Sequence, residues 1–210
     1  ASADETIKIW DLKTYQEIQT LEGHTEWVFS VAVSDDKKHI ISGGGDGIVM
    51  LWCFHAGKLI CCFEVHTDYI RCVALLSDGL RAVSASNDKS VRVWRLSSPN
   101  MGQERSSDYF EDVNNIALSR DGCMCVSASD DDTFKIWKCD TMEQCITLRG
   151  NEERAISVAV SADDRYFVSL SLKDNGSLST KVWNFHNGSG INKVDICATP
   201  KMVCFSSDGV

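Results

Sequence analysis

Short runs of apolar and β-branched residues alternate with turn-forming residues along most of this chain. In the segment 21–52 such runs lie at residues 27–33, 39–42 and 48–52, and they are separated by stretches of Ser, Asp and Gly. Runs of this length, bounded by turn residues, are typical of β-strands joined by tight hairpins. The pattern therefore predicts three consecutive antiparallel strands in this segment.

The same pattern recurs along the chain. Each copy closes on a tryptophan, and the spacing is 42 to 46 residues: Trp10, Trp52, Trp94, Trp137 and Trp183. An aspartate stands six residues before the tryptophan in four copies: Asp4, Asp46, Asp88 and Asp131. A serine stands four residues before the aspartate in three copies, at Ser42, Ser84 and Ser127, and a histidine stands 28 residues before the tryptophan in two, at His24 and His66. A fixed period of this length indicates a protein built from one repeated structural unit.

These offsets, together with the Gly23-His24 pair, resemble the WD-repeat family. The resemblance implies an all-β fold, a β-propeller of four-stranded antiparallel blades. On this alignment residues 1–210 form one propeller segment with four complete repeats, at 23–65, 66–107, 108–149 and 150–197, and partial repeats at 1–22 and 198–210. We expect a segment of a longer propeller rather than a closed five-bladed ring. The repeats also resemble the C-terminal arrays of NACHT-type or apoptosome-type signalling NTPases.

Two places depart from the regular pattern. Residues 97–107 carry Pro99, Gly102 and charges in place of alternation, which predicts a poorly paired outer strand. No histidine stands at the expected place in the repeats 108–149 and 150–197, and the latter has about four extra residues around 173–179. The position of its turn aspartate, Asp174 or none, stays open.

The recurring polar residues resemble a Ser-His-Asp triad, but the same set occurs twice at the same offsets. A catalytic triad is needed once. The family resemblance implies a buried hydrogen-bonded chain within each blade instead, in which the aspartate accepts from histidine and serine links histidine to the indole. These structural tetrads are His24, Ser42, Asp46 and Trp52 in one repeat and His66, Ser84, Asp88 and Trp94 in the next. We therefore expect no catalytic residues, and the glycines at 43–47, which match no phosphate-binding motif, indicate a hairpin turn.

The composition and charge of the chain limit the kinds of molecule that it is expected to bind. The chain has 210 residues and a net charge of −9, and no basic patch is apparent, which argues against nucleic acid and anionic membranes as partners. The ten cysteines mostly lie in strand patterns without metal-ligand spacing, so we expect small buried side chains and neither metal nor cofactor. With no signal peptide or long apolar run, the cysteines also favour a reducing compartment, cytoplasmic or possibly nuclear.

The resemblance implies a noncatalytic interaction scaffold that binds partner proteins or peptides, or other domains of the same parent chain, on one propeller face. That face is formed by the residues that enter the innermost strand of each blade. Tyr, Trp and Arg often anchor protein interfaces. The candidate partner-binding residues are Trp27, Phe29, Tyr69, Arg71, Asp112, Asn114, Arg154 and Ile156. The alternative function is a sensor or autoinhibitory propeller segment of a larger signalling NTPase.

Overall fold

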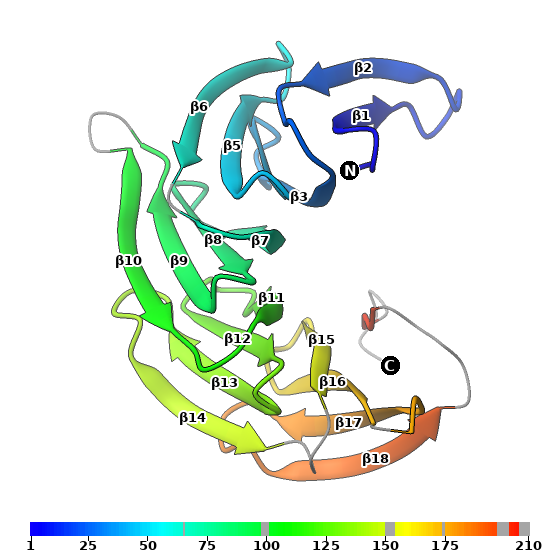
Figure 1. The fold of residues 1–210 in the computed structure, drawn as a ribbon, viewed down its shortest axis with the longest axis vertical. Coiled ribbons are helices and arrows are strands. Elements are labelled where there is room, and N and C mark those ends of the chain that lie inside the picture. The colour runs from blue at the N-terminus through cyan, green and yellow to red at the C-terminus, as the bar shows by residue number, and fades with distance from the viewer. Residues whose placement is uncertain (65, 98–100, 150–153, 174, 197–201, 206–210) are drawn as a thin grey trace. The chain divides into compact units, whose positions relative to one another are not determined.

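The computed structural model describes residues 1–64, 66–97, 101–149, 154–173, 175–196 and 202–205. Within these residues the chain forms four four-stranded antiparallel sheets and one two-stranded sheet (Figure 1). The predicted all-β class is therefore confirmed, and the sheets are consistent with propeller blades. The chain divides into two compact units, residues 1–104 and 105–210.

The first unit begins with the two-stranded sheet and continues with two sheets whose strands pair in chain order; residues 105–108 of the last strand already belong to the second unit. The two-stranded sheet consists of β1 (Thr6–Trp10) and β2 (Glu17–Glu22). What we call the first sheet consists of β3 (Val28–Val33), β4 (His39–Gly44), β5 (Ile48–Cys53) and β6 (Lys58–Glu64). The second sheet consists of β7 (Ile70–Leu75), β8 (Arg81–Ser86), β9 (Ser90–Arg95) and β10 (Gly102–Asp108).

The second unit holds two further sheets of the same order. The third sheet consists of β11 (Val113–Leu118), β12 (Met124–Ser129), β13 (Thr133–Lys138) and β14 (Gln144–Arg149). The fourth consists of β15 (Arg154–Val160), β16 (Tyr166–Leu172), β17 (Leu178–Asn184) and β18 (Gly190–Ile196). Because strands that follow one another in the chain are also neighbours in each sheet, each sheet is a meander built from local pairings.

The hairpin between the second and third strands of a sheet is set by the recurring aspartate. Asp46 Oδ1 accepts the backbone N–H of Ile48 at 3.1 Å, and Asp131 Oδ1 accepts that of Thr133 at the same distance. Gly47, between Asp46 and Ile48, has a φ of +71°, and Asp132 at the equivalent place has +64°. An aspartate that bonds the backbone two residues on is a common way to form a tight turn. The turn carries the aspartate to a fixed place at the end of the sheet.

The cores lie between neighbouring sheets within each unit. The first and second sheets bury Ile41, Leu51, Ile70 and Trp94 against one another, all at 0 % exposure. Gly43 is needed for this close packing, because a Cβ at this position would lie 2.5 Å from Ile70 Cγ2. The third and fourth sheets pack in the same way around a core that contains Val126, Phe134, Phe167 and Trp183. The closing tryptophans of the four-stranded sheets, Trp52, Trp94, Trp137 and Trp183, are all buried, whereas Trp10 of the two-stranded sheet is 51 % exposed. Burial of this side chain in each four-stranded sheet gives a physical reason for its recurrence.

Two expectations about strands need correction. Residues 102–108 form β10 and pair with β9, so the prediction of a poorly paired segment was wrong there; residues 98–100 lie outside the described residues. An outermost strand faces solvent, so backbone pairing holds it without an alternating pattern, and Arg95 adds a 2.7 Å hydrogen bond to Glu104. In the predicted partial repeat 198–210, the described residues 202–205 form no strand.

The cysteines are less buried than the strand pattern suggested. Among the nine described cysteines, all free thiols, only Cys125 and Cys139 are buried. Four are exposed: Cys62, Cys123, Cys145 and Cys204. Most of the exposed thiols lie on outer strands or at turns, where one side of the strand faces solvent, so the expectation that most would be buried was wrong.

Candidate interaction site

The first sheet contains a buried chain of hydrogen bonds that joins three of its parts. His24 Nδ1 lies 2.8 Å from Asp46 Oδ2, and His24 Nε2 lies 2.7 Å from Ser42 Oγ. The indole Nε1 of Trp52 donates to the same Ser42 oxygen at 2.8 Å. Because a carboxylate only accepts, the proton of the imidazole belongs on Nδ1, and Nε2 then accepts from the serine hydroxyl. The chain ties the segment before β3 to β4 and β5.

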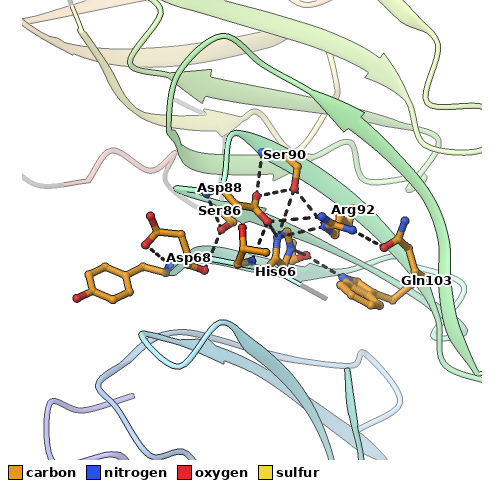
Figure 2. A network of polar contacts seen from close by, with 11 residues as sticks. His66, Asp68, Ser86, Asp88, Ser90, Arg92 and Gln103 are labelled. Carbon is orange, nitrogen blue, oxygen red and sulfur yellow. Dashed lines mark hydrogen bonds and ion pairs between the residues drawn. The ribbon is translucent and has the colours of Figure 1, made fainter. Parts of the chain in front are cut away.

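The second sheet repeats this arrangement and extends it. His66 Nδ1 lies 2.7 Å from Asp88 Oδ2, His66 Nε2 lies 2.6 Å from Ser84 Oγ, and Trp94 Nε1 donates to Ser84 at 2.8 Å. Figure 2 shows His66, Asp88, Ser90 and Arg92 pointing toward one another, with Gln103 at the far end. Arg92 Nε donates to Ser90 Oγ at 3.1 Å, and its Nη1 donates to Gln103 Oε1 at 2.5 Å. The network here reaches the outermost strand, β10.

Both aspartates are held in their ionised form. Burial by itself would raise the pKa of Asp46 and Asp88, but the hydrogen bonds that each carboxylate accepts, led by the bond to His24 or His66, together outweigh it. The pKa of each carboxyl therefore lies below its ordinary value, and that of Asp88 far below, since Ser90 also donates to it. Ser42 and Ser84 are 0 % exposed and have both neighbours in place. With the hydroxyl enclosed and bonded in this way, neither serine is placed to attack a substrate.

The third sheet carries a different group at the histidine position. Tyr109 stands 28 residues before Trp137, the offset of His24 from Trp52, and its hydroxyl bonds Ser127 Oγ. Ser127 also accepts from Trp137 Nε1 at 3.1 Å and donates to the carbonyl of Lys135 at 3.2 Å. Burial raises the pKa of Tyr109 well above its ordinary value, so the phenol stays a donor. The absence of histidine from this repeat thus does not leave Ser127 without a partner.

A lysine completes the third network. Lys135 Nζ lies 3.1 Å from Asp131 Oδ2 and 3.9 Å from the centroid of the Tyr109 ring. It therefore contacts the turn aspartate and the tyrosine that stands at the histidine position. The offset of 28 residues from the closing tryptophan is a sequence signal that points to Tyr109, although the residue there is not a histidine. Lys135 carries no such signal, because a lysine in a strand is ordinarily a solvent-facing residue.

The fourth sheet keeps only part of the arrangement in its described residues. Trp183 Nε1 donates to Ser169 Oγ at 2.8 Å, and Trp183 stacks on Phe167 with an interplanar angle of 6°. Asn151 and Asp174, the residues aligned with the histidine and the turn aspartate, lie outside the described residues. The extra residues lengthen this hairpin, whose strands β16 and β17 have seven residues each.

A recurring backbone bond brings the predicted partner-binding positions together at one end of each sheet. The residue before the turn aspartate donates its N–H to the residue that enters the innermost strand. The three bonds join Gly45 to Trp27 at 2.8 Å, Asn87 to Tyr69 at 2.9 Å and Asp130 to Asp112 at 2.9 Å. Each strand-entry residue is thus fixed beside the hairpin that carries the aspartate.

In the first unit these positions form a hollow of about 330 Å³, which we call the aromatic pocket. It is lined by Glu26, Trp27, Phe29, Gly45, Tyr69 and Arg71. Trp27 is 56 % exposed and Tyr69 45 % exposed, whereas Phe29 lies between them, with ring centroids 6.3 Å and 5.8 Å away. A Cβ at Gly45 would lie 3.1 Å from Glu26 Cβ, so a side chain at this position would crowd Glu26. Glu26 is the lining residue that the sequence alignment missed.

In the second unit the corresponding residues bond one another. Asn114 Nδ2 donates to Asp130 Oδ1 at 2.6 Å and to the carbonyl of Ala155 at 2.9 Å, and Arg154 forms an ion pair with Asp130. The hydrogen bond that Arg154 donates to the Asp130 carboxylate raises the pKa of Arg154 further. Asp112 supplies its carbonyl to Asp130, and Ile156 is partly buried in β15. These polar groups are therefore largely hydrogen-bonded or ion-paired within the second unit.

Among the described residues, no three or more His, Cys, Asp or Glu side chains gather in a way that would hold a metal ion. Over the same residues, no helix has the length and apolar character required to cross a membrane.

Comparison with known proteins places the repeats in a family. The model of the WD domain, G-beta repeat, matches residues 15–53, 57–95 and 106–138, together more than half of the chain. Nuclear distribution protein PAC1 of Arthroderma otae is 44 % identical over 52 residues, which are 25 % of this chain and 11 % of that protein. Small ribosomal subunit protein RACK1y of Oryza sativa subsp. japonica is 41 % identical over 59 residues, 28 % of this chain and 18 % of that protein.

WD repeat and SOCS box-containing protein 1 of Homo sapiens is 42 % identical over 53 residues, 25 % of this chain and 13 % of that protein. The chain therefore matches only a small part of the length of each of these relatives. The matched repeats, the four meander sheets and the closing tryptophans lead to one conclusion: this chain belongs to the WD-repeat family, a noncatalytic family of repeat proteins.

Proposed function

We propose that this chain is an interaction module whose aromatic pocket binds a peptide segment of a partner protein. The observation that carries the proposal is the exposure of Trp27 and Tyr69 around a hollow that also holds Arg71. Large aromatic side chains are normally buried away from water, so their exposure here indicates a surface that a partner covers. Trp, Tyr and Arg are also the residues that most often anchor protein interfaces.

We propose that the first unit, rather than the second, binds the peptide. In the pocket the aromatic rings face solvent, whereas the corresponding Asn114 and Arg154 are bonded to Asp130. A partner of the second unit would first have to break these bonds, which costs affinity. The acidic balance of the chain, −9 overall, supports protein or peptide partners over nucleic acid or anionic membrane, and we propose a cytoplasmic or nuclear location on the same basis as the reducing compartment.

The test is selection of short random peptides displayed on phage against the whole chain. We expect the wild-type chain to enrich a set of peptides, and the double substitution Trp27→Ala with Tyr69→Ala to lose them. Because both side chains are largely exposed, the melting temperature should stay unchanged.

The matched control is Tyr15→Ala, which removes an aromatic side chain that is 81 % exposed and does not line the pocket. This variant should retain every enriched peptide. Enrichment that survives the double substitution, or no enrichment by the wild-type chain, would reject the pocket as the binding site.

A further inference from the structure

The aromatic pocket holds one cation in a fixed position. The guanidinium carbon of Arg71 lies 5.1 Å from the centroid of the Phe29 ring and 5.7 Å from that of Tyr69. Its Nε donates to Asn87 Oδ1 at 2.9 Å. Ring contacts and this hydrogen bond restrict the side chain, so less entropy is lost when its remaining donors bind a ligand.

The arginine of the second unit has a different neighbour. Arg154 pairs with the carboxylate of Asp130, and Asp130 stands directly before its turn aspartate just as Asn87 does. At this repeated position the second sheet carries a neutral amide and the third sheet a carboxylate. The charge of Arg154 is therefore compensated inside the protein. Among the described residues, no carboxylate lies within ion-pair distance of Arg71, although Arg71 lines an open hollow.

We propose that the aromatic pocket recognises an acidic peptide: an Asp or Glu carboxylate on Arg71, next to a large apolar side chain packed against Trp27 and Tyr69. This rests on the peptide-binding function proposed above and specifies its ligand. A guanidinium offers paired N–H groups that match the two oxygens of a carboxylate. The exposed rings supply the apolar half of the site.

The charge in the pocket favours a carboxylate over a phosphate. Arg71 is the only cation among the lining residues, and Glu26 adds a negative charge to the same lining. A single guanidinium balances a carboxylate, which carries one charge, whereas a phosphate monoester carries close to two. The acidic side chain at position 26 would repel the second charge.

The peptides enriched by the wild-type chain test this inference. We expect them to carry Asp or Glu beside an aromatic residue or leucine. One enriched peptide is then synthesised in three forms, with the carboxylate, with the corresponding amide and with phosphoserine at that position. The amide should bind about tenfold more weakly or worse, as expected for loss of a charge-assisted hydrogen bond. A phosphoserine form that binds more tightly than the carboxylate form would overturn the choice of ligand.

Asn87→Asp is the most informative variant, because it places a carboxylate where Arg71 Nε now donates to an amide oxygen. It should weaken the carboxylate peptide about tenfold while leaving the melting temperature unchanged or higher. Arg71→Gln should weaken the same peptide equally, and Arg105→Gln, which removes an exposed charge outside the pocket, should not.

The outcomes separate this inference from the function on which it rests. Enriched peptides that lack carboxylates, but are still lost with Trp27→Ala and Tyr69→Ala, would overturn the acidic ligand and keep the pocket. Carboxylate peptides that bind Asn87→Asp as well as the wild type would likewise overturn the role of Arg71. Peptides that bind independently of Trp27 and Tyr69 would overturn both.

Discussion

The second and third sheets use different side chains to pair their buried serine and their turn aspartate. In each, a buried serine accepts from the indole of the closing tryptophan and needs a further partner. His66 fills this place in the second sheet and also binds the turn aspartate, Asp88. In the third sheet the two tasks are divided, since Tyr109 binds the serine and Lys135 binds Asp131.

The difference indicates what the repeat requires. Buried donors and acceptors must be paired, and the identity of the pairing residue is secondary. It also indicates where each sheet is vulnerable. Asp131 depends on Lys135 for its ion pair, whereas Asp88 has His66 as well as Arg92. Substitutions at matched positions should therefore differ in effect.

Among the substitutions that remove a single polar group, Lys135→Met should be the most damaging. It removes the charge that faces Asp131, with both side chains 9 % exposed, and keeps an apolar stem like that of Met50 at the same position of the first sheet. Breaking a buried ion pair by removing one partner costs about 3–5 kcal/mol. Urea unfolding would measure this loss. A free energy of unfolding within error of the wild type would show that Asp131 finds other partners.

Acid should weaken the second sheet through Asp88. Its folded-state pKa lies well below the ordinary 3.8, so the carboxylate stabilises the fold above about pH 4 and loses this contribution as the pH falls toward the folded-state pKa. Asp88→Asn cannot titrate. The difference in unfolding free energy between wild type and variant should therefore be larger at pH 7 than at about pH 3. An equal difference at both pH values would contradict the assignment.

Tyr109→Phe should have a smaller effect. The ring stays in place against Trp137 and under Lys135, and only the hydroxyl that donates to Ser127 is lost. Loss of one hydrogen bond costs about 1 kcal/mol. Tyr109→Ala serves as the reference, because it also removes the buried ring and should cost about 3–5 kcal/mol. If the two variants unfold at the same urea concentration, the hydroxyl rather than the ring carries the stability.

Arg92→Met should have the smallest effect. Arg92 occupies the strand position that Lys135 occupies in the third sheet, but its side chain is 18 % exposed and Asp88 keeps the bond from His66. Partly exposed ion pairs contribute about 0–1 kcal/mol. The loss on urea unfolding should stay below about 1 kcal/mol. A loss as large as that of Lys135→Met would show that the two sheets depend on this cation equally.

The amino-acid sequence was enough to predict the all-β class and the family, because both depend on local signals at fixed spacing. Strand runs, hairpin residues and the closing tryptophans repeat every 42 to 46 residues, and each sheet is built from neighbouring hairpins. The strand-entry positions Trp27 and Tyr69 followed from the same alignment. The outer strand β10 was not predicted from the sequence. An outer strand is held by backbone hydrogen bonds, which require no particular pattern of side chains.

Only the tertiary structure decided which of these positions form a usable surface. The alignment treats Arg71 and Arg154 alike as candidates, yet one lies over two aromatic rings and the other pairs with Asp130. It could not place Lys135 inside the sheet beside Tyr109 either. Pairing between side chains depends on distances and directions between strands, whereas a repeat pattern records only residue type and spacing. The sequence therefore determined the sheets, and packing decided what their side chains bind.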